Sequence, residues 1–189
     1  MRVRAGAVVL AFALVLTGAG CTGPASGAPR APTSAHPAPP PTREPAEAAG
    51  GACQLLSFEQ VAAALAVDFG VAGASSTGDT YTCVLRKVEA ALPDLSLSVS
   101  PTLADAAVFS ASVAPKGSAS IGDLGKVGYS RTVPAAGGAG PDAEVGWLSS
   151  NQRLMTLHFR TAPGTPAGDV TALIPKLVDL ARKVDQASA

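Results

Sequence analysis

The sequence predicts one α+β domain, in which an antiparallel β-sheet packs against helices, over residues 52–187. Three observations support this fold class. A helix-capping pattern stands at residues 57–60, residues 95–100 alternate between apolar and polar, and residues 165–184 carry an apolar stripe at helical spacing. Strands with one dry and one wet face suit an antiparallel sheet.

The first 20 residues have the three parts of a bacterial export signal. Arg2 and Arg4 precede an uncharged apolar run, and small residues lead up to Cys21. A cysteine at this place resembles the bacterial lipobox, in which the thiol is lipidated with acyl chains such as palmitate and cleavage makes it the new N-terminus. The resemblance implies a lipoprotein signal peptide at 1–20 and lipid attachment at Cys21. The protein would then be anchored in the cell membrane on its extracytoplasmic face.

An uncleaved membrane anchor is the alternative interpretation of this segment. The apolar run at residues 5–20 has 16 residues, whereas a stable membrane span needs about 20. The cleaved signal is therefore the prediction that fits the length better.

Residues 21–51 predict a disordered tether behind the lipidated cysteine. The segment contains eight prolines, and Ala, Ser, Thr and Gly lie between them without any apolar period. Such a composition cannot bury enough surface to offset the entropy of folding, and its prolines favour extended polyproline II. We expect it to hold the domain away from the lipid surface.

The domain opens with a predicted helix from residue 57. Ser57 and Gln60 fit a capping box, in which the side chain before the helix bonds to the backbone of the third helical residue. The apolar residues that follow have the spacing of a buried helix face. Glycines at 70 and 73 mark the end of regular structure after a short stretch at 66–71.

Strands are predicted next at residues 80–85 and 95–100. In the first strand, Tyr81, Cys83 and Leu85 share one side. In the second, three apolar residues alternate with three serines. A second helix is predicted at 102–112, with Asp105 at its third position.

The Gly-rich segment 118–142 shows no clear pattern, and the best hairpin pattern follows it. Residues 143–149 and 153–161 flank a short polar turn. In the second of these strands, residues 155, 157 and 159 share one face, and residues 154, 156, 158 and 160 share the other.

The last predicted helix is long and amphipathic. Thr165 stands at its N-cap and Pro166 at its first position, ahead of an apolar stripe that ends at Val184. Pro175 conflicts with this pattern because it removes a backbone donor. It should bend the helix or delay its start to about Leu173.

The cysteine count predicts one disulfide. If Cys21 carries the lipid, Cys53 and Cys83 remain as a pair, and disulfides persist outside the cytoplasm. The bridge would pin the first helix onto the sheet. Two free thiols or a redox pair are the alternatives, although redox pairs usually lie close together as C-x-x-C, which is absent here.

Composition and motifs argue against several classes of function. Without residues 1–20 the chain has 12 basic and 14 acidic residues and no basic patch, so nucleic acid is not an expected partner. His36 lies in the tether and His158 on a strand, so no histidine pair has metal spacing. The loop at 122–128 lacks the pattern of a phosphate-binding loop. We therefore predict no catalytic residues, no metal, no cofactor and no enzymatic activity, and we expect Trp147 to pack in the core.

With these elements placed, the chain resembles uncharacterised actinobacterial lipoproteins. The resemblance rests on the cysteine at the end of the leader, the Pro/Ala tether, Cys53-Gln-Leu-Leu-Ser57, Tyr81-Thr-Cys83 and the closing helix. That group is similar to the extracellular sensor domains of some mycobacterial serine/threonine kinases. The resemblance implies a helix-flanked antiparallel sheet with a groove, a binding function and no known reaction.

Three functions remain open from the sequence. The first is a tethered binding or sensor module for a small or lipidic component of the cell envelope. The second is a structural or adaptor protein that docks on another envelope protein and would show an exposed apolar patch. The third is an enzyme, which would need His158 or a pair of carboxylates to converge in a cleft.

Overall fold

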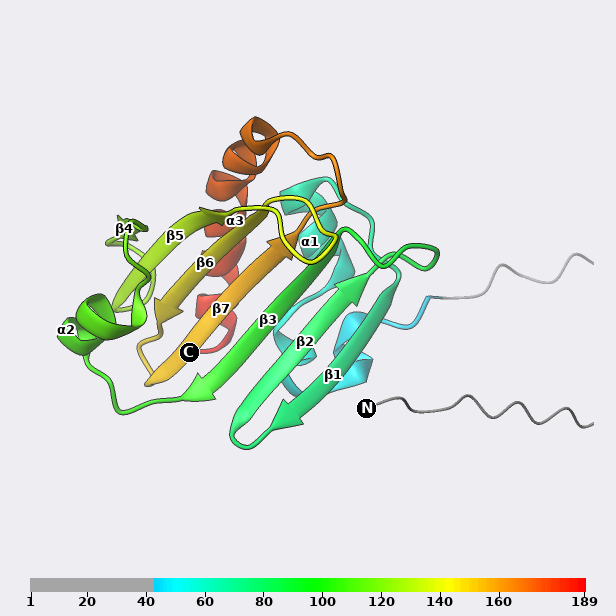
Figure 1. Cartoon of the computed structure of the whole chain (residues 1–189). Helices are drawn as coiled ribbons and strands as arrows, with labels where there is room; N and C mark the ends of the chain where they lie inside the picture. Colours follow the sequence, from blue (N-terminus) through cyan, green and yellow to red (C-terminus); the bar gives the residue numbers. More distant parts are fainter. Residues whose placement is uncertain (1–42) are drawn as a thin grey trace, which may run out of the picture. The chain divides into compact units, whose positions relative to one another are not determined.

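The chain has an α+β fold built around one seven-stranded antiparallel sheet (Figure 1). The computed structural model describes residues 43–189, so the predictions for the signal, for Cys21 and for most of the tether lie outside the described residues. The strands are β1 (Val71–Thr77), β2 (Thr80–Arg86), β3 (Asp94–Pro101), β4 (Ala119–Ile121), β5 (Val127–Val133), β6 (Asp142–Leu148) and β7 (Arg153–Arg160). The helices are α1 (Phe58–Leu65), α2 (Ala106–Val108) and α3 (Ala167–Ala187).

The strand order is β1-β2-β3-β7-β6-β5-β4. Strands β1, β2 and β3 pair in sequence order from one edge of the sheet, and β4, β5, β6 and β7 pair in sequence order from the other edge. The two halves meet where β3 pairs with β7. Helices α1 and α3 contact each other, and α3 also lies on β5 and β6 (Figure 1). The hairpin predicted at 143–161 is confirmed as β6 and β7.

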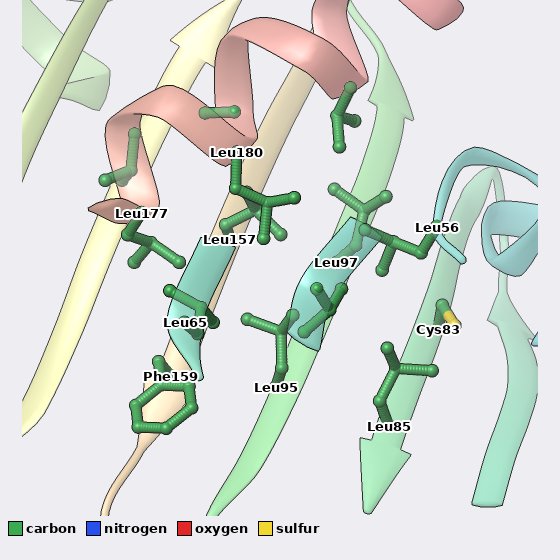
Figure 2. Close-up of a cluster of buried hydrophobic side chains, with 14 of the residues drawn as sticks. Leu56, Leu65, Cys83, Leu85, Leu95, Leu97, Leu157, Phe159, Leu177 and Leu180 are labelled. Carbon is green, nitrogen blue, oxygen red and sulfur yellow. The ribbon is translucent and has the colours of Figure 1, made fainter. Parts of the chain in front are cut away.

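The core lies between this pair of helices and one face of the sheet. Figure 2 shows Leu65 of α1 and Leu177 and Leu180 of α3 beside the leucines of the central strands. The residues predicted to share a face on β2, β3 and β7 do so. Their polar neighbours in sequence point to the opposite face, as the period of two requires.

Helix α1 begins as its capping pattern predicts. The Ser57 Oγ accepts a hydrogen bond from the Gln60 backbone N–H at 3.1 Å. Phe58, Val61 and Leu65 are buried, and the helix ends at Ala66, which has a left-handed φ of 56°. The Arg43 guanidinium lies 4.3 Å from the centroid of the Phe58 ring. Residues 43–51, which the sequence places in the tether, therefore already pack on the domain, and Ala46 is fully buried.

The disulfide predicted between Cys53 and Cys83 is present. Cys53 lies in a short 3-10 segment, η2 (Gly51–Leu55), which directly precedes α1. Cys83 lies in the middle of β2, and the two Cα atoms are 4.9 Å apart. The bond therefore fastens η2 to the sheet at a buried position.

Helix α3 runs unbroken through Pro175, so the predicted delay of its start to Leu173 is wrong. The helix begins at Ala167 with Pro166 at the N-cap, so the predicted N-cap at Thr165 and first helical position at Pro166 are each one residue too early. A proline inside a helix costs about 3 kcal/mol. Burial of each large apolar side chain contributes about 1.5–3 kcal/mol, and the stripe buries Val170, Leu177, Leu180 and Val184 together. Tertiary packing therefore outweighs the local penalty.

The helix predicted at 102–112 is shorter than expected. Asp105 caps it, because its Oδ1 accepts a hydrogen bond from the Val108 backbone N–H at 2.8 Å, so its predicted place at the third helical position is wrong. Three helical residues pass directly into a wider turn, η3 (Phe109–Val113). The Thr102 backbone N–H donates to the Gln152 carbonyl, which holds the preceding residues against the β6–β7 turn.

Two segments in which no strand was predicted contain three strands, β1, β4 and β5. The predicted end of regular structure is wrong at Gly73, which lies inside β1, whereas Gly70 lies in the irregular link between α1 and β1. The unassigned segment 118–142 contains β4 and β5. None of the helices in residues 43–189 has the length and apolar character that crossing a bilayer needs.

Candidate functional site

An apolar groove opens at the end of the sheet where β2 begins, β3 ends and β7 begins. It encloses about 410 Å³, within the range of about 300–1,000 Å³ typical of small-molecule sites. Its walls come from η2 on one side and the strand ends on the other. The lining residues are Gly51, Ala52, Gln54, Leu55, Tyr81, Val99, Pro101 and Arg153.

The groove lies in a gap between η2 and the end of α3, the two segments that cover this end of the sheet. Tyr81, Val99, Met155 and Trp147 form one cross-strand row on the core face of the sheet. The end of α3 covers the Met155 and Trp147 half of this row, and the Ser188 hydroxyl contacts the Met155 sulfur at 3.8 Å. Segment η2 packs on β1, β2 and β3. Between these two covers, Tyr81 remains 50% exposed while Val99 forms a floor that is 8% exposed.

One cation stands at this apolar site. Arg153 is the first residue of β7, pairs in register with Pro101 and is exposed. Residues 43–189 contain six arginines, and Arg153 alone among them forms no ion pair with another described residue. The groove therefore combines an apolar floor with one guanidinium that the described part of the chain leaves available.

The opposite face of the sheet carries a ladder of charges on β2, β3 and β7, and a small apolar cluster that includes Phe109, Tyr129 and Leu148. Arg86, Asp94 and Arg160 are direct cross-strand neighbours on β2, β3 and β7. The Asp94 carboxylate is 1% exposed and accepts two hydrogen bonds from Arg160, one of them from Nε at 3.0 Å. The Arg86 Nε lies 3.8 Å from the same carboxylate. Opposite charges directly across strands stabilise the register of this sheet.

Glu144 forms the second charged cluster on that face. Both of its carboxylate oxygens accept hydrogen bonds from Arg131 at 2.9 Å, and the Tyr129 hydroxyl donates to it at 2.7 Å. Burial raises the pKa of the Glu144 carboxyl, but the bonds from Arg131 and Tyr129 outweigh it and hold that pKa below its usual value. Burial, together with the Glu144 carboxylate, raises the pKa of Tyr129.

This cluster should make the domain sensitive to acid. Because the pKa of Glu144 is lower in the folded state than in the unfolded state, its stabilisation is present above the unfolded pKa and is lost as the pH falls through the folded one. We expect the free energy of unfolding, measured by urea titration, to fall as the pH is lowered from about 5 to about 3. The Glu144→Gln variant should fall less over the same interval, and an equal fall in both proteins would contradict this assignment.

His158 lies on β7, beside Asp142 of β6. Its Nε2 is 3.2 Å from the Asp142 Oδ2, and it lies between Ser96 and Glu144 in register, on the same face as the charge ladder. In residues 43–189 no three His, Cys, Asp or Glu side chains come together as a metal site would need. His158 and the groove lie on opposite faces of the sheet, because His158 alternates with the core residues of β7.

The sequence placed some of these residues correctly and missed others. Trp147 is fully buried, as predicted, and its indole N–H donates to Asp185 at 2.9 Å. Leu124, in the loop between β4 and β5, packs into the core. Tyr81 shares a side of β2 with Cys83 and Leu85, as predicted, but no sequence pattern indicates that it lines a groove. Arg153 was seen only as the start of a hairpin strand.

The fold and the groove together define an α+β domain with an apolar site at one end of its sheet. No protein-family model, curated protein or solved structure matches this chain.

Proposed function

We propose that this chain is a lipid-anchored extracytoplasmic module that binds a small or lipidic component of the cell envelope without catalysis. The observation that supports binding most strongly is the groove, which is apolar, of ligand size and open to solvent at Tyr81. The leader and Cys21 support the location, and the resemblance to actinobacterial lipoproteins remains a prediction alongside them.

The disulfide holds one wall of the groove in place, which is typical of a binding site that is formed before the ligand arrives. Cys53 holds η2 in place, and η2 supplies four of the residues that line the groove. Rigid walls reduce the entropy that is lost when a ligand binds. The groove should therefore be ready to bind without rearrangement of the fold.

An adaptor that docks on another envelope protein is the second candidate. Within residues 43–189, β1 is an edge strand of the sheet, which favours this candidate because the strand has seven residues and no charge or proline to discourage pairing with a further strand. Crosslinking in cells would separate the candidates, since an adaptor should yield one defined partner.

Filling the groove should weaken binding of an uncharged apolar probe. A chain of residues 22–189, which omits the signal and the lipidated Cys21, would be titrated with N-phenyl-1-naphthylamine, whose fluorescence rises in apolar surroundings. We expect Val99→Trp to weaken binding by about tenfold or more, because the indole would occupy the floor of the groove. Gln54→Trp changes an exposed residue of the rim, so it tests the same site with little cost to folding.

Ser98→Trp is the matched control for this experiment. It places the same indole on the same strand but on the opposite face of the sheet. Probe binding should stay close to that of the unchanged chain. If the unchanged chain and all three tryptophan variants bind the probe equally, the probe binds outside the groove. That result would contradict the proposed binding site.

A further inference from the structure

We propose that the groove takes a single-chain amphiphile with a carboxylate head, and that Arg153 pairs with the carboxylate. This inference rests on the proposed function and names the ligand class of the same site. The chain would lie along Val99 and Leu55, with the Tyr81 ring at the exposed wall.

The charges in the domain support an anionic head. Five of the six arginines in residues 43–189 have an acidic partner among those residues, and Arg153 has none there. Among the described residues, no acidic side chain lines the groove. A guanidinium beside apolar surface complements an anion that is attached to an apolar body, and its planar fork matches a carboxylate in a bidentate manner.

The volume of the groove and its single cation further restrict the class of ligand. A volume of about 410 Å³ lies near the lower end of the range for ligand sites, which suits one acyl chain better than two. One guanidinium balances one negative charge, as a carboxylate carries at neutral pH, whereas a phosphate monoester carries more. A long-chain carboxylic acid meets both conditions.

Three ligands with the same chain and different heads test this class. Dodecanoate, dodecanol and dodecylamine, each below its micelle concentration, would compete with N-phenyl-1-naphthylamine for the chain of residues 22–189. We expect dodecanoate to bind about tenfold more tightly than dodecanol and dodecylamine to bind weakest, because Arg153 attracts only the anion. Arg153→Gln should weaken dodecanoate to the level of dodecanol and leave dodecanol unchanged.

Two further variants separate a specific contact from general charge. Arg153→Lys should keep part of the preference for dodecanoate, because it retains the charge and loses the bidentate fork. Lys176→Gln removes an exposed cation of α3 outside the groove and should change nothing. An equal loss with Lys176→Gln would overturn the proposal.

The outcomes distinguish this proposal from the one on which it rests. If all three ligands compete equally, or if Arg153→Gln leaves dodecanoate unchanged, the ligand class is wrong while the groove remains a binding site. If neither the probe nor any ligand binds, or if binding survives Val99→Trp, the proposed function itself fails. A preference for dodecylamine would contradict the role of Arg153 directly.

Discussion

Removing the disulfide should lower the free energy of unfolding by about 3–4 kcal/mol. Cys53 and Cys83 are 30 residues apart, and in the chain-entropy model a crosslink of that span restricts the unfolded state by about this amount. The variant that carries both Cys53→Ala and Cys83→Ala avoids an unpaired thiol. Urea unfolding of this variant and of the oxidised chain measures the difference.

The reduced protein is the control for this experiment. The chain without substitutions, unfolded in the presence of a reductant, should match the double variant within about 1 kcal/mol, because both lack only the crosslink. Probe binding should weaken in both, since η2 is no longer fastened beside the groove. A double variant as stable as the oxidised chain would show that the bond does not hold the fold together.

Trp147→Ala should be the most destabilising single substitution in the core, at about 3–5 kcal/mol. The indole is fully buried in the large core cluster, in the row that α3 covers. Truncation removes its apolar contacts, leaves a cavity and takes the donor from Asp185. Thermal or urea unfolding of the purified chain measures the effect.

Trp147→Phe keeps the comparison measurable if the alanine variant does not fold. Phenylalanine fills most of the space but cannot donate to Asp185, so we expect a smaller loss of about 1–2 kcal/mol. Asp185→Ala should reproduce the part of that loss that comes from the hydrogen bond. Equal stability of Trp147→Ala and Trp147→Phe would contradict the importance of volume at this position.

The elements that could be predicted from the sequence have strong local patterns. The cap at Ser57, the alternation before Ser100 and the apolar stripe of α3 each lie within one segment and need no knowledge of distant residues. Strand β1 was not predicted because it lies at the edge of the sheet and is exposed along most of its length. Its sequence therefore shows no alternation of apolar and polar residues. Strand β5 was not predicted because residues 128–130 are all buried, so the strand lacks the alternation of apolar and polar residues.

The groove could not be predicted because it depends on where covering elements end. The sequence shows that Tyr81 shares a side with the core residues of its strand, but whether a helix lies over it is decided by η2 and α3 from other parts of the chain. The same holds for Arg153. Its lack of an acidic partner becomes visible only once the register of β3 and β7 places Pro101 opposite it.

Native mass spectrometry of the protein extracted from the membranes of its own cells tests the account most directly. Under denaturing conditions, we expect a polypeptide that begins at Cys21 and carries covalent lipid. Under native conditions, we expect one additional molecule with the mass of a long-chain carboxylic acid, which is absent from the Val99→Trp protein. A native mass equal to the denatured one, or a bound molecule that Val99→Trp retains, would contradict the claim that the groove binds a ligand.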